Sequence, residues 1–206
     1  MRVLEAGRLV VVGGHSRGVG KTALVEHILR AGPASHWVAV KISAHRHTPG
    51  GGRGALVERD ERGAPGTQTG RYLAAGAREA WLCHAADIAM ADAARFIARR
   101  LANGDDVIVE SNRIVESFTP ATTLFVLSPP FDDWKPSSVH AVRVADAFVL
   151  GPVARGGAAH WPLDADRLDG RPVFDLRVPD GLDRWFASRH RPSAAAWPHA
   201  LHQAPA

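Results

Sequence analysis

Five residues between positions 18 and 110 have the types and spacing needed to hold a phosphate chain and its metal. Gly18 and Gly20 precede Lys21 and Thr22, so a flexible turn ends in an ammonium group and a hydroxyl. In phosphate-binding loops the backbone N–H groups curl around the phosphates, the lysine neutralises them and the hydroxyl holds Mg²⁺. Glu110 closes the apolar run DVIVE and supplies the acidic group that such a metal requires. The pattern predicts a site for Mg²⁺ with GTP or ATP.

The loop departs from the commonest pattern where it begins. That pattern is a glycine, four residues and then Gly-Lys-Thr or Gly-Lys-Ser, but here His15 takes the place of the first glycine and Gly14 comes one residue early. A glycine-rich turn that binds no phosphate is the alternative, and the apolar run before it and the helical pattern after it disfavour that alternative. We expect ten consecutive residues to bind the nucleotide: Gly14, His15, Ser16, Arg17, Gly18, Val19, Gly20, Lys21, Thr22 and Ala23.

Further polar residues lie where a ligand of this loop could reach them. Lys41 ends an apolar run, and strand ends face the ligand crevice of open parallel sheets, so we expect it to join Lys21 and Glu110 in catalysis. The alternative for Lys41 is a side chain that only reaches solvent. His45 and His47 could share a face of an extended loop and hold a metal or phosphate, but with no third ligand a plain pair of loop histidines is favoured. Arg71 is a candidate contact to the outer phosphate or to a client molecule.

Alternating apolar and helical segments predict the elements that position these residues. The pattern indicates an α/β fold in three layers, with a mostly parallel sheet between helices. Strands are expected at 8–13, 37–43, 79–84, 106–111, 123–128 and 146–151, with an edge strand at 172–177. Helices are expected at 20–31, 67–77, 86–102 and 137–145.

The remaining segments divide the chain into one domain and a tail. Residues 46–66 are rich in glycine and charge, and we interpret them as a mobile surface loop that meets a client, or else as a structureless insertion. We expect a single nucleotide-binding domain over 1–188 and a flexible C-terminal tail over 189–206, where no core pattern is present.

Composition excludes several classes of protein. Of the 206 residues 46% are hydrophobic and 22% charged, which is typical of a globular domain. The net charge of +4 is spread along the chain, so we do not expect nucleic acid as a partner. The apolar runs are too short to span a bilayer, and the N-terminus lacks a signal-peptide pattern. With a single cysteine, Cys83, these features favour a cytoplasmic protein.

The motifs also resemble known families. The spacing from Gly14 to Thr22 resembles dethiobiotin synthetase and the cobyrinate amidation enzymes, which are P-loop proteins. Together with VAVKISAHRH (38–47), the helix containing Ala75-Gly76-Ala77 and VIVESN (107–112), the loop resembles the molybdopterin-guanine dinucleotide biosynthesis adaptors, a P-loop family that binds GTP. The resemblance covers about residues 8–112. It departs from that family at Arg17 and at the segment Ser111-Asn112-Arg113, where the family has a glycine.

These resemblances imply a P-loop NTPase fold and a set of functions. The leading hypothesis is a Mg²⁺-dependent nucleoside triphosphatase that serves cofactor biosynthesis, acts with a cofactor-biosynthesis enzyme and forms a homodimer. An ATP-dependent small-molecule ligase or kinase, and a non-catalytic module gated by nucleotide, stay open. The sequence lacks the Asn-Lys-x-Asp segment that recognises guanine, so residues 150–153 or 128–130 are the candidates for base contacts. Asp132-Asp133 could form a second carboxylate site, but its position after Pro129-Pro130 favours a solvated turn.

Overall fold

The computed structural model describes residues 4–32, 37–43, 55–85, 89–128, 133–151 and 168–190. The histidine pair at 45 and 47, the first part of the expected 46–66 loop and the tail after 190 lie outside these residues. Within the described ranges, no helix combines the length and the apolar character needed to cross a bilayer.

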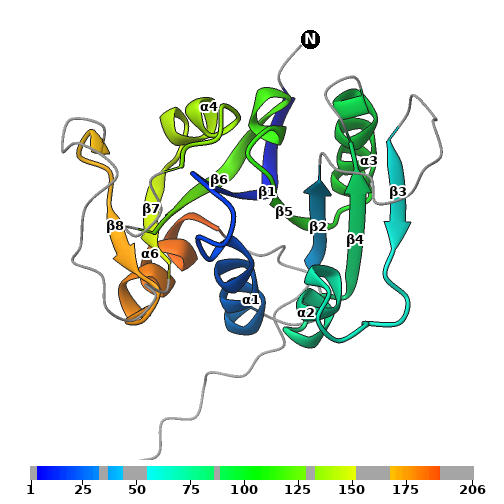
Figure 1. Ribbon diagram of the computed structural model, residues 1–206, viewed down its shortest axis with the longest axis horizontal. Coiled ribbons are helices and arrows are strands. Elements are labelled where there is room, and N and C mark those ends of the chain that lie inside the picture. Colours follow the sequence, from blue (N-terminus) through cyan, green and yellow to red (C-terminus); the bar gives the residue numbers. More distant parts are fainter. Residues whose placement is uncertain are drawn as a thin grey trace, which may run out of the picture.

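One mixed sheet dominates the fold (Figure 1). Among the described residues, eight strands form it in the order β3-β4-β2-β5-β1-β6-β7-β8. All neighbouring pairs are parallel except β3 with β4. The strands are β1 (Leu4–Gly14), β2 (Trp37–Ser43), β3 (Leu56–Arg59), β4 (Glu79–His84), β5 (Asp106–Glu110), β6 (Phe118–Leu127), β7 (Ala147–Leu150) and β8 (Val173–Asp175).

Helices cover both faces of the sheet and make the expected three layers. They are α1 (Lys21–Ala31), α2 (Gln68–Ala74), α3 (Met90–Ala102), α4 (Ser138–Arg143) and α6 (Asp180–Arg189), with a short 3₁₀ turn η2 (Ile114–Glu116). In Figure 1, α3 and α4 lie on one side of the sheet, and α1, α2 and α6 lie on the other.

Alternate residues of the central strands feed two separate cores. Leu9 and Val11 of β1 point into the core beneath α3 and α4, whereas Val10 and Val12 point into the core beneath α1, α2 and α6. All four side chains are fully buried, as expected for a central strand that is covered on both faces. This arrangement explains why the strands read as continuous apolar runs.

Several sequence expectations need correction. Residues 46–66 are not wholly a loop, because β3 lies within them and pairs antiparallel with β4 at the sheet edge. The strand expected at 123–128 begins at Phe118. The expected boundary between domain and tail, at 188/189, falls inside α6, which ends at Arg189. The residue after the helix, His190, is buried and its ring stacks on that of Trp37. The edge strand expected at 172–177 is present as β8.

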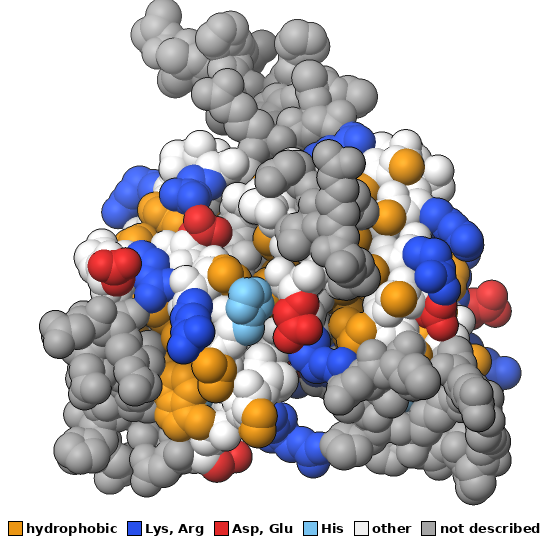
Figure 2. All heavy atoms as spheres, turned by 90° about the horizontal axis from the view of Figure 1, so that it is seen from above, with side chains coloured by type: hydrophobic (Ala, Val, Ile, Leu, Met, Phe, Trp, Pro, Cys, Tyr) orange, Lys and Arg blue, Asp and Glu red, His pale blue; other side chains and the backbone are white. Residues whose placement is uncertain are grey.

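The surface shown in Figure 2 carries its charges in a mixed pattern. On this face, Lys and Arg side chains are interspersed with acidic and hydrophobic ones over several elements and do not merge into one basic patch. A concentrated set of cations is found instead inside a cavity at the carboxyl ends of the central strands.

Candidate functional site

The glycine-rich loop connects β1 to α1 and curls as a phosphate-binding loop must. Gly18 and Gly20 adopt positive φ values of 75° and 104°, a region in which glycine carries no steric cost. Gly20 is the N-cap of α1, and its carbonyl accepts the first bond of the helix from the Leu24 N–H at 3.0 Å. The start of α1 therefore presents unsatisfied N–H groups and its positive dipole end to the loop.

His15 explains the unusual entry to the loop. Its side chain is fully buried, its ring lies 5.1 Å from that of Trp134, and its Nε2 accepts a hydrogen bond from the Ser128 N–H at 3.0 Å. Burial, and to a smaller extent the charge of Lys21, lower the pKa of His15, so the ring is held neutral. The imidazole anchors the loop to the end of β6 and does not line the cavity, so a contact of this residue with nucleotide would involve its backbone.

A second anchor holds the residue that precedes His15. Asn112 donates from Nδ2 to the Gly14 carbonyl at 2.9 Å and accepts the Gly14 N–H on Oδ1 at 2.8 Å. A Cβ at position 14 would lie 2.9 Å from a methyl of Val19 and 3.0 Å from the Val126 carbonyl, so glycine is required there for space. Gly14, the early glycine, and Asn112, which follows β5, therefore act together to fix the start of the loop.

Thr22 and Glu110, the two residues expected to hold Mg²⁺, are in contact in the structure. Thr22 donates its hydroxyl to Glu110 Oε2 at 2.8 Å, and both side chains are buried. Gln68 of α2 donates to the Thr22 hydroxyl at 3.0 Å, and the Tyr72 hydroxyl donates to the same oxygen of Glu110. Lys41, from the neighbouring strand β2, forms an ion pair with the other oxygen, Oε1.

The charge state of Glu110 follows from these contacts. Its burial alone would raise the pKa, but the attraction of Lys41 and the hydrogen bonds from Lys41, Tyr72 and Thr22 outweigh burial and lower it. Glu110 is therefore a buried carboxylate that stays ionised and is satisfied on both oxygens.

Lys21 folds back over the loop, and its ammonium group donates to the Ser16 carbonyl. The pKa of Lys21 is lowered to about 8, because burial, together with repulsion by Lys41 and Lys135, outweighs the attraction of Glu110. The cations thus destabilise one another, as expected at a site shaped for an anion.

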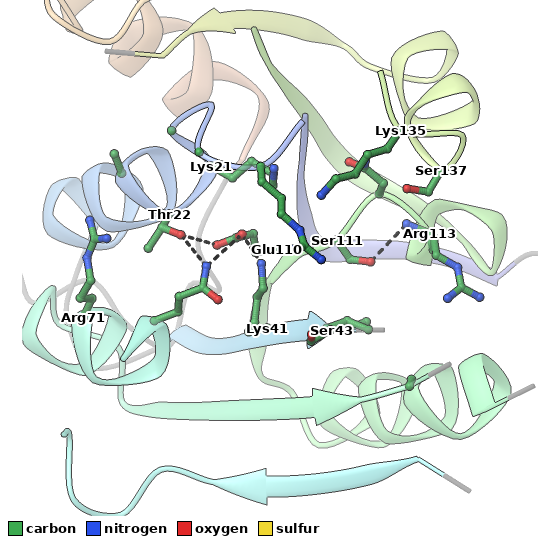
Figure 3. Close-up of a pocket in the computed structure, with 18 residues that line it drawn as sticks. Lys21, Thr22, Lys41, Ser43, Arg71, Glu110, Ser111, Arg113, Lys135 and Ser137 are labelled. Carbon is green, nitrogen blue, oxygen red and sulfur yellow. Dashed lines mark hydrogen bonds and ion pairs between the residues drawn. The ribbon is translucent and has the colours of Figure 1, made fainter. Parts of the chain in front are cut away.

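A cavity of about 890 Å³ opens beside these residues. In Figure 3 the ammonium groups of Lys21, Lys41 and Lys135 point toward one space, with Arg71 at one end and Arg113 at the other. The described lining residues include six cationic side chains and one carboxylate, which gives a formal charge of +5. These cations are Arg17, Lys21, Lys41, Arg71, Arg113 and Lys135, and the carboxylate is Glu110.

The chain is similar to a known protein in structure but not in sequence. No protein-family model matches the chain, and no curated protein matches it by sequence. A crystal structure of LpxK from Aquifex aeolicus, in complex with ATP, superposes with a TM-score of 0.52 at 16% sequence identity. The match covers 85% of this chain and 56% of LpxK, so the chain spans little more than half of that protein. The chain has the α/β fold of the P-loop NTPases.

The remaining residues considered in the sequence analysis differ in how they are placed relative to the P-loop and the cavity. Arg71 lines the cavity, but its guanidinium forms an ion pair with Glu26 of α1. Asp133, interpreted as part of a solvated turn, accepts a hydrogen bond from the P-loop residue Ser16 at 2.5 Å. Gly151 lies against the P-loop, because a Cβ there would come 1.9 Å from the Val19 carbonyl oxygen.

Sequence reasoning missed four residues of the site: Gln68, Arg113 and Lys135, which line the cavity, and the buried Tyr72, which donates to Glu110. The spacing of Gln68 and Tyr72 puts them on one face of α2, a signal that could have been noticed. Lys135 follows Asp133-Trp134, where only the turn composition was considered. Nothing in its local sequence shows that it lies beside the P-loop.

The donor set near Thr22 fits a small hard cation. A hydroxyl and a carboxylate lie side by side, and Mg²⁺ prefers oxygen ligands and usually takes one or two protein groups together with phosphate oxygens and water. The described residues contain no group of three or more His, Cys, Asp or Glu side chains placed to hold a metal on their own. A cation there would therefore depend on the ligand's oxygens.

Proposed function

We propose that this P-loop protein binds a nucleoside triphosphate with Mg²⁺ at residues 14–23 and hydrolyses it slowly. The observation that carries the proposal is that three features lie together at one end of a cationic cavity. They are the glycine-rich loop, the start of α1 and the hydrogen-bonded pair Thr22–Glu110. Lys21 would leave the Ser16 carbonyl for the outer phosphates, and the N–H groups of the loop would hold the remaining oxygens.

Thr22 and Glu110 would hold Mg²⁺, which offsets the charge of the phosphates when it is bound. Lys41 would keep Glu110 ionised and oriented, since it occupies the other carboxylate oxygen. Gln68 and Tyr72 would fix the remaining hydrogen bonds of the pair. Catalysis would then rest on positioning and charge neutralisation, so intrinsic turnover is expected to be slow without a partner.

The finer assignment draws on the resemblances. The resemblance to molybdopterin-guanine dinucleotide biosynthesis adaptors favours GTP, a client enzyme of cofactor biosynthesis, a cytoplasmic location and a homodimer. The structure of LpxK in complex with ATP favours testing ATP beside GTP. Gly151 touches the P-loop at Val19 and Ser128 bonds to it at His15, so both segments, 150–153 and 128–130, stay candidates for contacts to the base.

A second candidate is ATP-driven transfer or ligation on a small anionic substrate. It is favoured by the size of the cavity and by two cations that come from other elements than the P-loop, Arg113 and Lys135.

Two assays, one of phosphate release and one of nucleotide binding, test and separate these functions. Wild-type protein with Mg²⁺ and either ATP or GTP should release phosphate, and Lys21→Ala should reduce the rate by about 10²-fold or more. Arg143→Ala, a charge change on the exposed side of α4, is the matched control and should leave the rate unchanged. Release that requires an added small acid supports ligation, and bound nucleotide without turnover supports the non-catalytic module. Absence of nucleotide binding contradicts all three.

A further inference from the structure

The segment just before α4 is docked on the entry of the P-loop. The Asp133 carboxylate accepts a hydrogen bond from the Ser16 hydroxyl at 2.5 Å, and the Lys135 N–H donates to the His15 carbonyl at 3.0 Å. Between these two contacts, the Trp134 ring lies 5.1 Å from that of His15. Three consecutive residues of the segment therefore meet two consecutive residues of the loop, and this fixes where the Lys135 side chain begins.

The segment meets the loop at the end where the outer phosphate of a nucleotide would lie. In P-loops the lysine that precedes the Thr or Ser contacts the outer phosphates. Here that lysine is Lys21, and its ammonium group lies at the Ser16 carbonyl. Ser16 is also the residue whose hydroxyl is bonded to Asp133. The docked segment and the Lys21 ammonium group thus share one end of the loop.

The Lys135 side chain is directed into the same space as that of Lys21. Both residues line the cavity, and in Figure 3 their ammonium groups point toward one region. Burial is the main cause of the lowered pKa of Lys21, and repulsion by Lys135 contributes to it, so the two charges interact. Lys41 is paired with Glu110, whereas Lys135 forms no ion pair within the described part of the chain. The ammonium group of Lys135 is therefore available to a ligand.

We propose that Lys135 is a further catalytic residue, whose ammonium group contacts the outer phosphate of the bound nucleotide and stabilises the charge on it during hydrolysis. In that step the oxygen of a water molecule bonds to the outer phosphorus, and the bond from this phosphorus to the bridging oxygen breaks. The diphosphate leaves with the electron pair, and one proton of the water passes to solvent. A cation that is already in place stabilises the transition state without reorganisation. The inference rests on the proposed function, because it names a further contact at the same nucleotide.

Comparison of three nucleotide complexes tests this role. Calorimetry measures the affinity of wild type and of Lys135→Ala, with Mg²⁺, for a non-hydrolysable triphosphate analogue, for the diphosphate, and for the diphosphate with fluoroaluminate, which mimics the transferred phosphoryl group. Lys135→Ala should bind the triphosphate analogue at least about tenfold more weakly than wild type, and the fluoroaluminate complex should be weakened more. Affinity for the diphosphate should stay within about twofold, because the diphosphate lacks the outer phosphate.

Two further variants serve as controls. Lys135→Arg keeps a cation and should recover part of the lost affinity for the triphosphate analogue. Arg143→Ala removes one exposed positive charge from α4 and should match wild type within about twofold. The hydrogen bond from Lys135 to His15 is made by the main chain, so replacement of the Lys135 side chain keeps it.

The outcomes separate this inference from the proposed function. No binding of the triphosphate analogue by wild type overturns the nucleotide site and this inference together. Binding by wild type with equal affinity in Lys135→Ala, or equal weakening of the diphosphate and triphosphate complexes, overturns the contact of Lys135 with the outer phosphate alone. A fluoroaluminate complex that is weakened no more than the triphosphate complex, or that wild type does not form, overturns the catalytic role.

Discussion

The hydroxyl of Thr22 lies 2.8 Å from the carboxylate of Glu110, although 88 residues separate them in the chain. Thr22 is in the first turn of α1, and Glu110 is the last residue of β5, which is hydrogen-bonded to β1 in parallel. The register that places Val12 beside Glu110 therefore brings the P-loop and its acidic partner together. This pairing joins the two motifs of the proposed metal–phosphate site.

Removal of the Thr22 hydroxyl should remove the effect of Mg²⁺ on nucleotide binding. Thr22→Ala deletes the metal-binding oxygen, whereas Thr22→Ser keeps it, so Mg²⁺ should tighten binding by at least about tenfold in wild type and Thr22→Ser but not in Thr22→Ala. Titrations with Mg²⁺ and with a chelator measure this effect. An equal Mg²⁺ effect in Thr22→Ala would show that this hydroxyl does not contact the metal.

Nucleotide affinity should fall as pH rises through the pKa of Lys21. With that pKa at about 8, Lys21 is mostly charged at about pH 7 and mostly neutral at about pH 9.5, and the anionic nucleotide prefers the charged form. The dissociation constant should therefore increase by about tenfold over this range. Lys21→Arg keeps its charge at every such pH and should give a flatter profile. A profile as steep in Lys21→Arg as in wild type would assign the effect to another group.

The buried pair Lys41–Glu110 should be costly to break from one side. Glu110→Gln leaves the Lys41 ammonium, which is 14% exposed, without its partner, and should destabilise the fold by about 3–5 kcal/mol. Lys41→Met combined with Glu110→Gln removes the stranded charge and should recover part of that loss. Chemical denaturation of both single variants and the double variant measures the coupling. Strict additivity of the two changes would contradict a direct interaction.

Gly151 should be required for the shape of the P-loop. A methyl group at this position would overlap the Val19 carbonyl oxygen at 1.9 Å, so Gly151→Ala should push the loop out of shape and weaken nucleotide binding by more than about tenfold. Gly7→Ala is the matched control, because a Cβ there meets nothing within 4 Å and should leave binding unchanged. Normal binding by Gly151→Ala would mean that the contact is easily relaxed.

The sequence predicted those parts of the fold that have a strong apolar signal. The runs that became β2, β4 and β5 were recognised within a residue or so, because these strands lie inside the sheet and are covered by the two cores. The edge strand β3 escaped recognition, since it has one partner and its side chains are mostly exposed. In α6 only Leu182 is fully buried, so no helical stripe was visible.

The site residues also divide into those whose positions could be predicted from the sequence and those whose positions could not. Lys21, Thr22, Lys41 and Glu110 were predictable because each lies at the end of a recognised strand or at the start of a recognised helix, and the structure brings all four together. The burial of His15 was not predictable, because it depends on Trp134, which is 119 positions further along the chain. Contacts of this kind are set by tertiary packing and leave no local pattern.

The most direct test of the account is a calorimetric titration of ATP and of GTP, with Mg²⁺, into wild type and Lys21→Ala. Arg143→Ala controls for the loss of one charge, and circular dichroism confirms that each variant is folded. The account predicts that wild type and Arg143→Ala bind at least one nucleotide with equal affinity, and that Lys21→Ala binds it at least about tenfold more weakly. Equal affinity in folded Lys21→Ala, or no binding by wild type, would contradict a triphosphate site at residues 14–23.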